Sequence, residues 1–345
     1  MDLVNQKIIQ AVIEKAEQVC SESLALIGIY GSVATADTYE KSDLDLLILI
    51  ENEEGWKLGT GFILDDHNVG YDIYCTHWDG LRYDAECHHA HLSKLMDSQI
   101  VYIKNRQAYH QLCQLRTQVA RFLESEDRFK CVDELIDKAK ICYANACLSE
   151  ALGRVRLEAS GVISYLLDAI MLYHGTYFRR GVKRTFEELA ALPLDDRFVH
   201  TIQKVVVSKE VSELRNLLKG LILYAGSHVQ RKSMKSAPSE ALSGTYEEMY
   251  SNWRNKVEAA AINNDPFASF MNMCSLQYML LEIAGSVEIG SFDIMDVYDP
   301  DTLENNTEVF DRYLQKYEQV YQQAGIEVRR FADVDAFVAH YLRER

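Results

Sequence analysis

A glycine-serine turn after an apolar run constrains the fold of this chain more than any other feature. Residues 24–30 are mostly Leu and Ile, and Gly31-Ser32 follows them directly. An apolar run of this length, bounded by glycine, predicts a buried β-strand. Glycine lets the backbone approach a ligand closely, and the short helix that we expect to begin at Ser32 would offer free N–H groups to an anion.

Two acidic elements follow this turn. Asp43 and Asp45 stand at the start of a second apolar run, residues 44–51, and Asp72 is the charge within a third, residues 69–75. Side chains alternate between the two faces of a strand, so Asp43 and Asp45 point to the same side. If the strand of Asp72 pairs beside theirs, three carboxylates converge on one patch. A charge in an apolar strand is costly when it is buried unpaired, which favours a functional role for Asp72.

Such a patch suits divalent cations and phosphates. Clustered carboxylates repel one another, and a divalent cation relieves the repulsion. Mg²⁺ prefers oxygen ligands and is typically held by one or two carboxylates together with substrate phosphates. The strand, the Gly-Ser turn and the two acidic elements therefore predict a site for a nucleoside triphosphate and metal. The alternative is an exposed acidic turn at the start of a strand.

These residues resemble the polymerase-β-type nucleotidyltransferase superfamily. The likeness is carried by Gly31-Ser32, the ten residues after it, Asp43-Leu-Asp45 and the later strand with Asp72. Within the superfamily, the chain looks most like bacterial aminoglycoside nucleotidyltransferases and their relatives. Many members carry a basic or glycine residue a few positions after the turn, and residues 33–40 contain neither.

The resemblance implies a role for each motif residue. Asp43, Asp45 and Asp72 are the implied catalytic residues and metal ligands. The first two hold the metal, with two Mg²⁺ ions expected, and Asp45 and Asp72 flank the attacking oxygen. Ser32 and nearby N–H groups hold the β- and γ-phosphates. The nucleotide-binding residues that we expect are Gly31, Ser32, Ser42 and Lys183.

The later part of the chain offers further candidates. A basic stretch, residues 179–184, could meet the triphosphate through Lys183, or it is a solvated loop with charges that complement a helix end. Asp72 is the first candidate to activate an acceptor hydroxyl, and one of three later carboxylates could share that role, or each is a solvated or capping acid. Asp168 is the strongest of the three because its helix is apolar nearly all round. The three are Glu150, Glu158 and Asp168. His88 and His91 could bind a metal from one helix face, but no zinc signature with glutamate surrounds them, which favours exposed or substrate-lining histidines.

Composition and charge exclude several classes of protein. The 345 residues carry a net charge of −16 with a pI of about 5.1, which disfavours nucleic acid and suits a cationic small molecule better. None of the eight cysteines forms a Cys-x-x-Cys pair, so we expect buried free thiols in a reducing compartment rather than a disulfide framework. There is no signal-peptide pattern, and no apolar run approaches the roughly 18 residues of a membrane span. We therefore expect a cytoplasmic protein.

The order of the apolar patterns predicts an α+β fold. An amphipathic helix over residues 3–20, the strands above, a short strand at 99–104 and a helix at 106–124 make a small mixed-sheet domain. A charged break follows. We place the boundary there, with a nucleotidyltransferase catalytic domain over residues 1–125 and an all-α, substrate-binding helical bundle over residues 126–345.

Six to eight helices are expected in the bundle. Residues 133–149 and 151–173 could form one long helix with a kink, and Gly175 is a candidate C-cap. Residues 233–240 are expected to form a surface loop. Further helices are expected at 196–206, 209–224, 245–261, 265–284, 303–323 and 332–344.

The combined prediction is a metal-dependent nucleotidyltransferase. It would move a nucleoside monophosphate, AMP from ATP, to a hydroxyl of a small-molecule acceptor that resembles an aminoglycoside. Its partners would be the nucleoside triphosphate and the acceptor, with no nucleic acid and no membrane. Two alternatives stay open: an enzyme that AMPylates a protein, and a fold that binds nucleotide without turnover.

Overall fold

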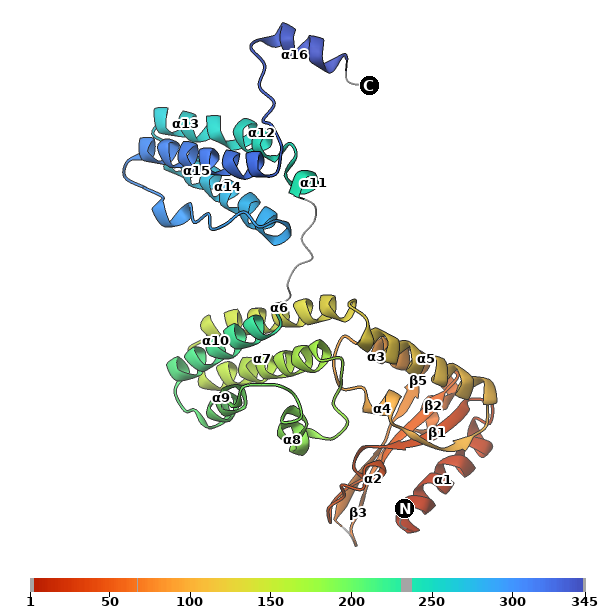
Figure 1. Cartoon of the computed structure of the whole chain (residues 1–345). Coiled ribbons are helices and arrows are strands. Elements are labelled where there is room, and N and C mark those ends of the chain that lie inside the picture. The colour runs from red at the N-terminus through yellow and green to blue at the C-terminus, as the bar shows by residue number, and fades with distance from the viewer. Residues whose placement is uncertain (1–2, 67, 231–237, 344–345) are drawn as a thin grey trace. The chain divides into compact units, whose positions relative to one another are not determined.

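A computed structural model of the chain describes residues 3–66, 68–230 and 238–343. The chain divides into two compact units, Met1–Gln230 and Arg231–Arg345. An α+β region opens the first unit and a helical region follows, so the expected fold class is confirmed (Figure 1). None of the helices in the described ranges has the length and apolar character needed to span a bilayer.

A four-stranded sheet is the centre of the α+β region, with the order β5-β2-β1-β6. β1 (Leu24–Tyr30) pairs antiparallel with both β2 (Asp45–Ile50) and β6 (Gln99–Ile103), and β2 pairs parallel with β5 (Cys75–His77). β1 and β2 are buried on both faces, which explains why their sequences are continuous apolar runs.

The strand that carries Asp72 belongs to a separate two-stranded sheet, formed by β3 (Thr60–Leu64) and β4 (Val69–Ile73). The expectation that this strand pairs beside β2 is wrong, because β1 and β5 already pair with the two edges of β2. Asp72 is exposed, whereas its neighbours Tyr71 and Ile73 are buried. β4 therefore buries one face only, and Asp72 avoids the cost of a buried charge.

Each face of the four-stranded sheet has its own core. α1 (Leu3–Val19), η1 (Glu53–Leu58) and the buried face of β4 cover one side. α3 (Trp78–Ala85) and α5 (Arg106–Glu124) cover the other. Alternate side chains of β2 enter the two cores, so the strand holds both together. Two short helices complete this region, α2 (Gly31–Ala34) and α4 (Ser93–Met96).

The next two helices pack side by side. α6 (Arg128–Cys147) and α7 (Leu152–Tyr173) run antiparallel, with Asn145 near Glu158, so the alternative of one long kinked helix is wrong. After α7, Gly175 has a φ of +66°, as a C-cap requires. The remaining helices of the first unit are η2 (Val182–Arg184), α8 (Thr185–Leu189), α9 (Asp196–Val207) and α10 (Val211–His228).

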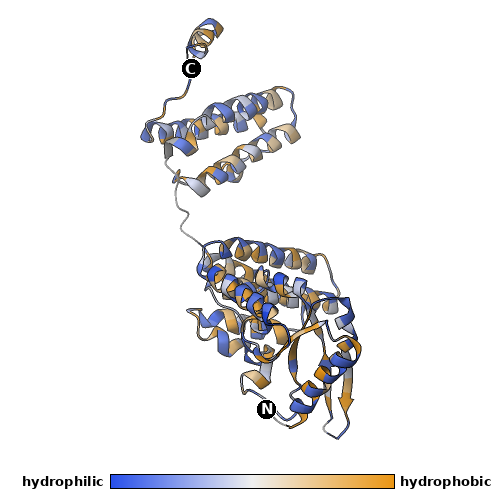
Figure 2. Cartoon of the chain, turned by 90° about the vertical axis from the view of Figure 1, so that its right-hand side faces the viewer, coloured by the Kyte–Doolittle hydropathy of each residue, from blue (hydrophilic) through white to orange (hydrophobic). Residues whose placement is uncertain are grey.

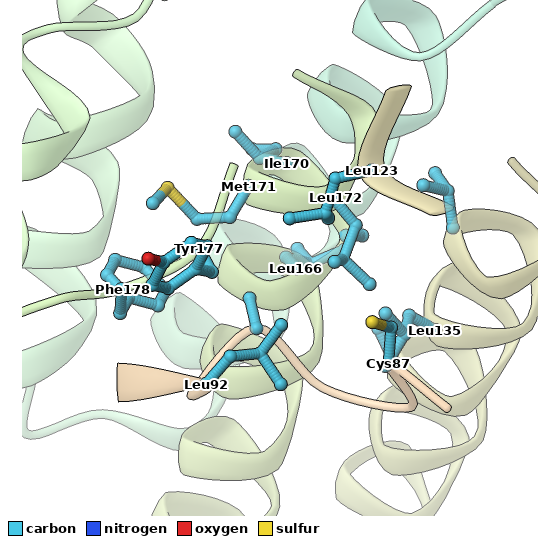
Figure 3. Close-up of a cluster of buried hydrophobic side chains, with 14 of the residues drawn as sticks. Cys87, Leu92, Leu123, Leu135, Leu166, Ile170, Met171, Leu172, Tyr177 and Phe178 are labelled. Carbon is cyan, nitrogen blue, oxygen red and sulfur yellow. The ribbon is translucent and has the colours of Figure 1, made fainter. Parts of the chain in front are cut away.

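One buried cluster joins the sheet to these helices. Leu123 of α5, Leu135 of α6 and Leu166 of α7 meet Cys87 and Leu92 from the segment between α3 and α4 (Figure 3). The expected boundary after residue 125 therefore lies inside the first unit and inside this cluster. The functional division at that boundary, catalysis before it and substrate binding after it, stays a prediction.

The second unit is helical and has a separate core. Its π-helical turn, η3, lies between α12 and α13, and α14 and α15 are its longest helices. Residues 233–237 of the expected surface loop lie outside the described residues, and a helix starts at Pro238. The elements are α11 (Pro238–Leu242), α12 (Thr245–Met249), η3 (Tyr250–Arg254), α13 (Asn255–Ile262), α14 (Pro266–Ser286), η4 (Met295–Val297), α15 (Leu303–Gln323) and α16 (Val334–Tyr341).

All eight cysteines of the chain are free. Three of them are buried in the first unit, namely Cys20, Cys75 and Cys87, and Cys147 is exposed.

Candidate functional site

β1 and β2 bring the Gly-Ser turn against Asp45. Tyr30, the last residue of β1, lies opposite Asp45, the first residue of β2, so α2 begins beside that carboxylate. Gly31 has a φ of +67°, and a Cβ at this position would lie 1.9 Å from Asp45 Oδ2. Any other residue would be strained there and would displace the carboxylate. The backbone N–H of Ser32 donates a hydrogen bond to Asp45.

The loop that follows α2 ends at Ser42 and Asp43. Ser42 Oγ accepts a hydrogen bond from the N–H of Tyr39 at 2.9 Å, and the Ser42 N–H donates to Tyr39 O at 3.0 Å. This pair of bonds closes the turn that precedes Asp43. Asp43 is exposed and Asp45 is half-buried, with the buried Leu44 between them. Ser42 thus shapes the loop, and a contact from Ser42 to a nucleotide stays a prediction.

Asp43 and Asp72 line the same cleft, although Asp43 lies in the loop before β2 and Asp72 in β4 of the two-stranded sheet. The cleft has a volume of about 630 Å³, within the usual range of ligand pockets. The rings of Phe62 and Tyr71 stack in it at 5.2 Å. Glycines at two other lining positions leave room for a ligand close to the backbone. The lining residues are Asp43, Gly61, Phe62, Ile63, Gly70, Tyr71 and Asp72.

Four carboxylates lie near the phenol of Tyr30 and affect its pKa. Its pKa is raised to about 12, first by burial and then by four carboxylates. A phenolate would be repelled by each of these charges, so all four lie within electrostatic reach of the Tyr30 hydroxyl. In order of their effect on the pKa, they are Asp45, Asp84, Asp43 and Asp72.

Asp43 and Asp45 have no cationic partner among the residues that the structure describes. Burial and the charge of Asp43 raise the pKa of Asp45 to about 6, and the Ser32 N–H opposes this shift. Neither carboxylate forms an ion pair with a described residue. In its donor chemistry the pair fits a divalent cation, which would relieve this repulsion.

The described ranges contain no group of three or more His, Cys, Asp and Glu side chains that could hold a metal ion. Asp43, Asp45 and Asp72 therefore do not form a three-ligand cage, and a cation held by Asp43 and Asp45 would need further ligands from substrate and water. Asp72 as a metal ligand stays a prediction.

Lys183 lies against the loop that joins Ser32 to Asp43. Its Nζ donates to Asp37 O at 2.8 Å and lies 5.2 Å from the ring centroid of Tyr39. The Asp37 N–H in turn donates to Ser32 O at 2.9 Å. Asp37 thus links Lys183 to the Gly-Ser turn through hydrogen bonds. Lys183 brings a cation to a loop that has no basic residue at positions 33–40.

Arg184 fixes the same loop through a paired contact. Its Nε and Nη2 donate to the two carboxylate oxygens of Asp37 at 2.8 and 2.6 Å. These hydrogen bonds lower the pKa of Asp37 to about 2. The basic stretch therefore contacts the loop through η2, and Lys183 Nζ lies 3.8 Å from Asp37 Oδ2.

The carboxylates of the helical region have structural partners. Glu150 pairs with Arg215 at 2.9 Å and Glu158 with Arg154 at 2.7 Å. Asp168 is buried, and its Oδ1 accepts a hydrogen bond from the N–H of Ala90 at 3.0 Å. Burial raises the pKa of Asp168.

His88 and His91 do not share a helix face, because residues 86–90 form turns and bends and residues 91–92 have no regular structure. His88 contacts Glu86 at 3.0 Å, and His91 lies 3.6 Å from Asp168. The alternative that the sequence analysis disfavoured, two histidines on one helix face, is absent here, and the favoured prediction of exposed or substrate-lining histidines stays open.

Two acidic residues near the site were not predicted. Asp37 anchors the loop, and its loop composition gave no signal for this role. Asp84 lies on the buried face of α3 and contacts Lys94 at 3.2 Å and His89 at 3.4 Å. Asp84 follows Leu81 by three residues, so a charge on the apolar face of an amphipathic helix was a signal that could have identified it.

Comparisons with known proteins add a structural likeness. No protein-family model matches the chain, and no curated protein matches it. A crystal structure of a nucleotidyltransferase-like protein from Exiguobacterium sibiricum 255-15 is similar to it, with 16% sequence identity and a TM-score of 0.32, over 72% of this chain and 80% of that protein. These values are too low for the likeness to indicate a function.

Proposed function

We propose that this chain is a nucleotidyltransferase that moves AMP from ATP to a hydroxyl group of a small-molecule acceptor. One observation carries the proposal: Asp43 and Asp72 open onto one cleft while Asp45 lies against Gly31 at the turn. Carboxylates on a cleft beside a glycine turn suit phosphate transfer, in which catalysis is mainly positioning and charge neutralisation.

The proposed reaction exchanges one bond at phosphorus for another. The acceptor oxygen bonds to the α-phosphorus, the bond from the α-phosphorus to the bridging oxygen of the β-phosphate breaks, and pyrophosphate leaves. Asp72, which is exposed in the cleft, accepts the proton of the hydroxyl. Ser32 and Lys183 bind the β- and γ-phosphates. Mg²⁺, if held by Asp43 and Asp45, would neutralise charge on the triphosphate and on the leaving group.

We further propose that the acceptor is a cation, as an aminoglycoside-like compound would be. The net charge of −16 supports this choice, as do the four carboxylates that act on Tyr30. An acidic cleft attracts and orients a cationic ligand. Cytoplasmic location remains part of the same proposal, because ATP is an intracellular substrate.

The test is transfer of label from α-³²P-ATP to a panel of aminated, hydroxylated compounds in the presence of Mg²⁺. We expect Asp43→Asn and Asp45→Asn to lower the rate by roughly 10²–10³-fold or more. Asp65→Asn, at an exposed turn after β3, is the matched control and should keep the full rate.

Transfer that survives both site substitutions would overturn the proposal. Label found on a protein band would identify a protein-modifying enzyme instead. ATP binding without release of pyrophosphate would identify a nucleotide-binding module without turnover.

A further inference from the structure

Two histidines meet at the ends of α7 and α10. His174 follows α7 as its C-cap residue, His228 is the last residue of α10, and their Nε2 atoms lie 2.9 Å apart. This is the distance of a hydrogen bond between ring nitrogens, so one neutral ring carries the Nε2 proton and the other accepts it. The proposed transfer reaction uses neither side chain.

The two helices run side by side in the same direction. Near their first residues, Arg156 Nη2 donates a hydrogen bond to Ser208 O at 3.1 Å, and near their last residues the two histidines meet. The helices share one core, for example through Leu166 and Leu221. Figure 2 shows hydrophilic and hydrophobic residues along the same helices, as expected for helices that bury one face. The histidine pair therefore joins the C-terminal ends of two parallel helices.

Aromatic rings cover part of each imidazole. Tyr224 stacks on the His228 ring at 5.8 Å, and Tyr173 lies edge-on to both histidine rings, at 5.2 and 5.7 Å. Tyr224 in turn stacks on Phe198 of α9 at 5.0 Å, and its hydroxyl accepts a hydrogen bond from the Asp195 N–H at 2.9 Å. Both histidines are half-buried as a result, and burial disfavours the charged form of an imidazole.

The nearby charge from α6 is a cation. Arg128 Nε donates a hydrogen bond to Tyr173 O, a carbonyl at the end of α7, at 3.3 Å. The negative end of a helix dipole would favour a protonated histidine here, but Arg128 already supplies that charge. Burial lowers the pKa of both histidines, and His228 and then Arg128 lower the pKa of His174 further.

The nearby charges from α9 do not reverse this balance. The Asp195 carboxylate pairs with Arg197, and only the Asp195 backbone N–H contacts Tyr224. No carboxylate among the described residues raises the pKa of either histidine. One proton added to the pair can be shared, because an imidazolium still donates to a neutral imidazole. A second proton would place two cations in contact, and the hydrogen bond would be lost.

We propose that His174 and His228 form a proton-sensitive clasp, which joins the ends of α7 and α10 near neutral pH and opens when both rings are protonated. Opening frees the last turn of α10. The unfolded chain binds protons at the ordinary histidine pKa of about 6.5, whereas the closed clasp resists them. The free energy of unfolding that the clasp contributes is therefore present above that pH and is lost as the pH falls below it.

NMR of the full chain, with ¹⁵N in its imidazole rings, tests the clasp directly. At pH 8 we expect a scalar coupling between the two Nε2 nuclei, because they share a hydrogen bond. The coupling should disappear at pH 5, and both rings should titrate below the ordinary value of about 6.5. His174→Gln and His228→Gln assign the two signals. Absence of the coupling at pH 8, or ordinary titration of both rings, overturns the proposal.

Urea unfolding at pH 8 and pH 5 measures the effect on the first unit. The double variant His174→Gln/His228→Gln retains groups that can form a hydrogen bond but cannot titrate. Between pH 8 and pH 5, the unfolding equilibrium constant of the wild type should rise at least tenfold more than that of the double variant. His110→Gln is the matched control, because His110 is exposed on α5 and should leave the wild-type profile unchanged. An equal pH dependence in the wild type and the double variant overturns the proposal.

Amide hydrogen exchange locates the opening. After correction for the intrinsic effect of pH on exchange, residues 225–229 should exchange several-fold faster at pH 5 than at pH 8 in the wild type, and not in the double variant. Circular dichroism at pH 8 verifies that the variants fold. Exchange that does not change with pH in the wild type overturns the proposal, since Tyr224 and Phe198 would then hold the end of α10 without the histidine pair.

Discussion

Among single residues, Gly31 has the least freedom to change. Its positive φ and the carboxylate of Asp45 both exclude a side chain. Gly31→Ala should lower the free energy of unfolding by about 1–2 kcal/mol, and it should cut nucleotidyl transfer far more because Asp45 has to move. Urea unfolding and label transfer measure the two effects. Gly181→Ala is the control, as Gly181 has open space around its Cβ position and a negative φ. Equal behaviour of the two variants would contradict a steric role for Gly31.

The raised pKa of Asp45 predicts that the free energy of unfolding depends on pH. Its pKa in the folded protein is about 6, above the usual value for aspartate. The protonated form therefore favours folding, and this contribution is lost as the pH rises through 6. Asp45→Asn should raise the free energy of unfolding at pH 8 by about 1–2 kcal/mol while it abolishes transfer, with little gain near pH 4.

Thermal or urea unfolding of the wild type and this variant at both pH values is the measurement. Asp65→Asn is exposed and should show no gain that depends on pH. If Asp45→Asn lowers the free energy of unfolding at pH 8, the charged form of Asp45 does not destabilise the folded protein.

At the scale of elements, the contact between η2 and the loop at residues 35–44 orders the candidate site. Arg184→Ala removes the paired contact with Asp37 and leaves its half-buried carboxylate with the more distant Lys183 at 3.8 Å. Amide hydrogen exchange across residues 35–44 should then rise several-fold, and the KM for ATP should rise with it. Arg180→Ala is the control, since Arg180 contacts Glu187 rather than the loop. Unchanged exchange in the Arg184 variant would show that the loop is ordered by its own turns.

A second prediction at this scale concerns the role of Asp168 on α7. The geometry favours a structural role, because Asp168 holds the Ala90 N–H. Asp168→Ala should lower the free energy of unfolding by about 1–3 kcal/mol, as an unsatisfied buried N–H does. Asp168→Asn retains an acceptor and should keep most of the transfer activity. Loss of transfer in a stable Asp168→Asn variant would instead support the role of a general base.

Elements with a strong period were predictable from the sequence, and pairings between them were not. α5 and α15 have the predicted bounds, 106–124 and 303–323, because one apolar face defines each helix. β4 was predicted as a strand but with the wrong neighbour, since alternation reveals the buried face of a strand and not its partner. Asp43 and Asp72 nevertheless share a cleft. Two residues can line one cleft when their backbones lie close together, even if their strands do not pair. The expected cluster of Asp43 and Asp72 was therefore possible although the expected strand pairing was wrong.

At the scale of the whole molecule, a break in the hydrophobic pattern of the sequence locates the division between units less well than the buried cores do. The charged stretch at residue 125 separates two helices that bury side chains in one cluster, whereas the division between units falls at residue 230. Helical periodicity carries no information about which helices share a core. The predicted loop at residues 233–240 begins just beyond that division. A catalytic domain that ended at residue 125 would lack α6 and α7, whose buried side chains share this cluster with Leu123 of α5.

The separate cores predict which part of the chain can fold alone. Every buried residue of the two sheet-associated cores lies before residue 230, and the third core lies after residue 241. Residues 1–230 should therefore fold alone and retain ATP binding, because Asp43, Asp45, Asp72 and Lys183 are all among them. Residues 1–125, by contrast, should aggregate or remain unfolded, because an apolar helix face would be exposed.

Calorimetry and ATP titration of both segments measure the difference. The 1–230 segment should melt in one cooperative transition that matches a transition of the full chain within a few degrees. A stable, ATP-binding segment of residues 1–125 would restore the boundary predicted from the sequence, and the cluster shared by α5, α6 and α7 would then be an interface between two domains rather than one core.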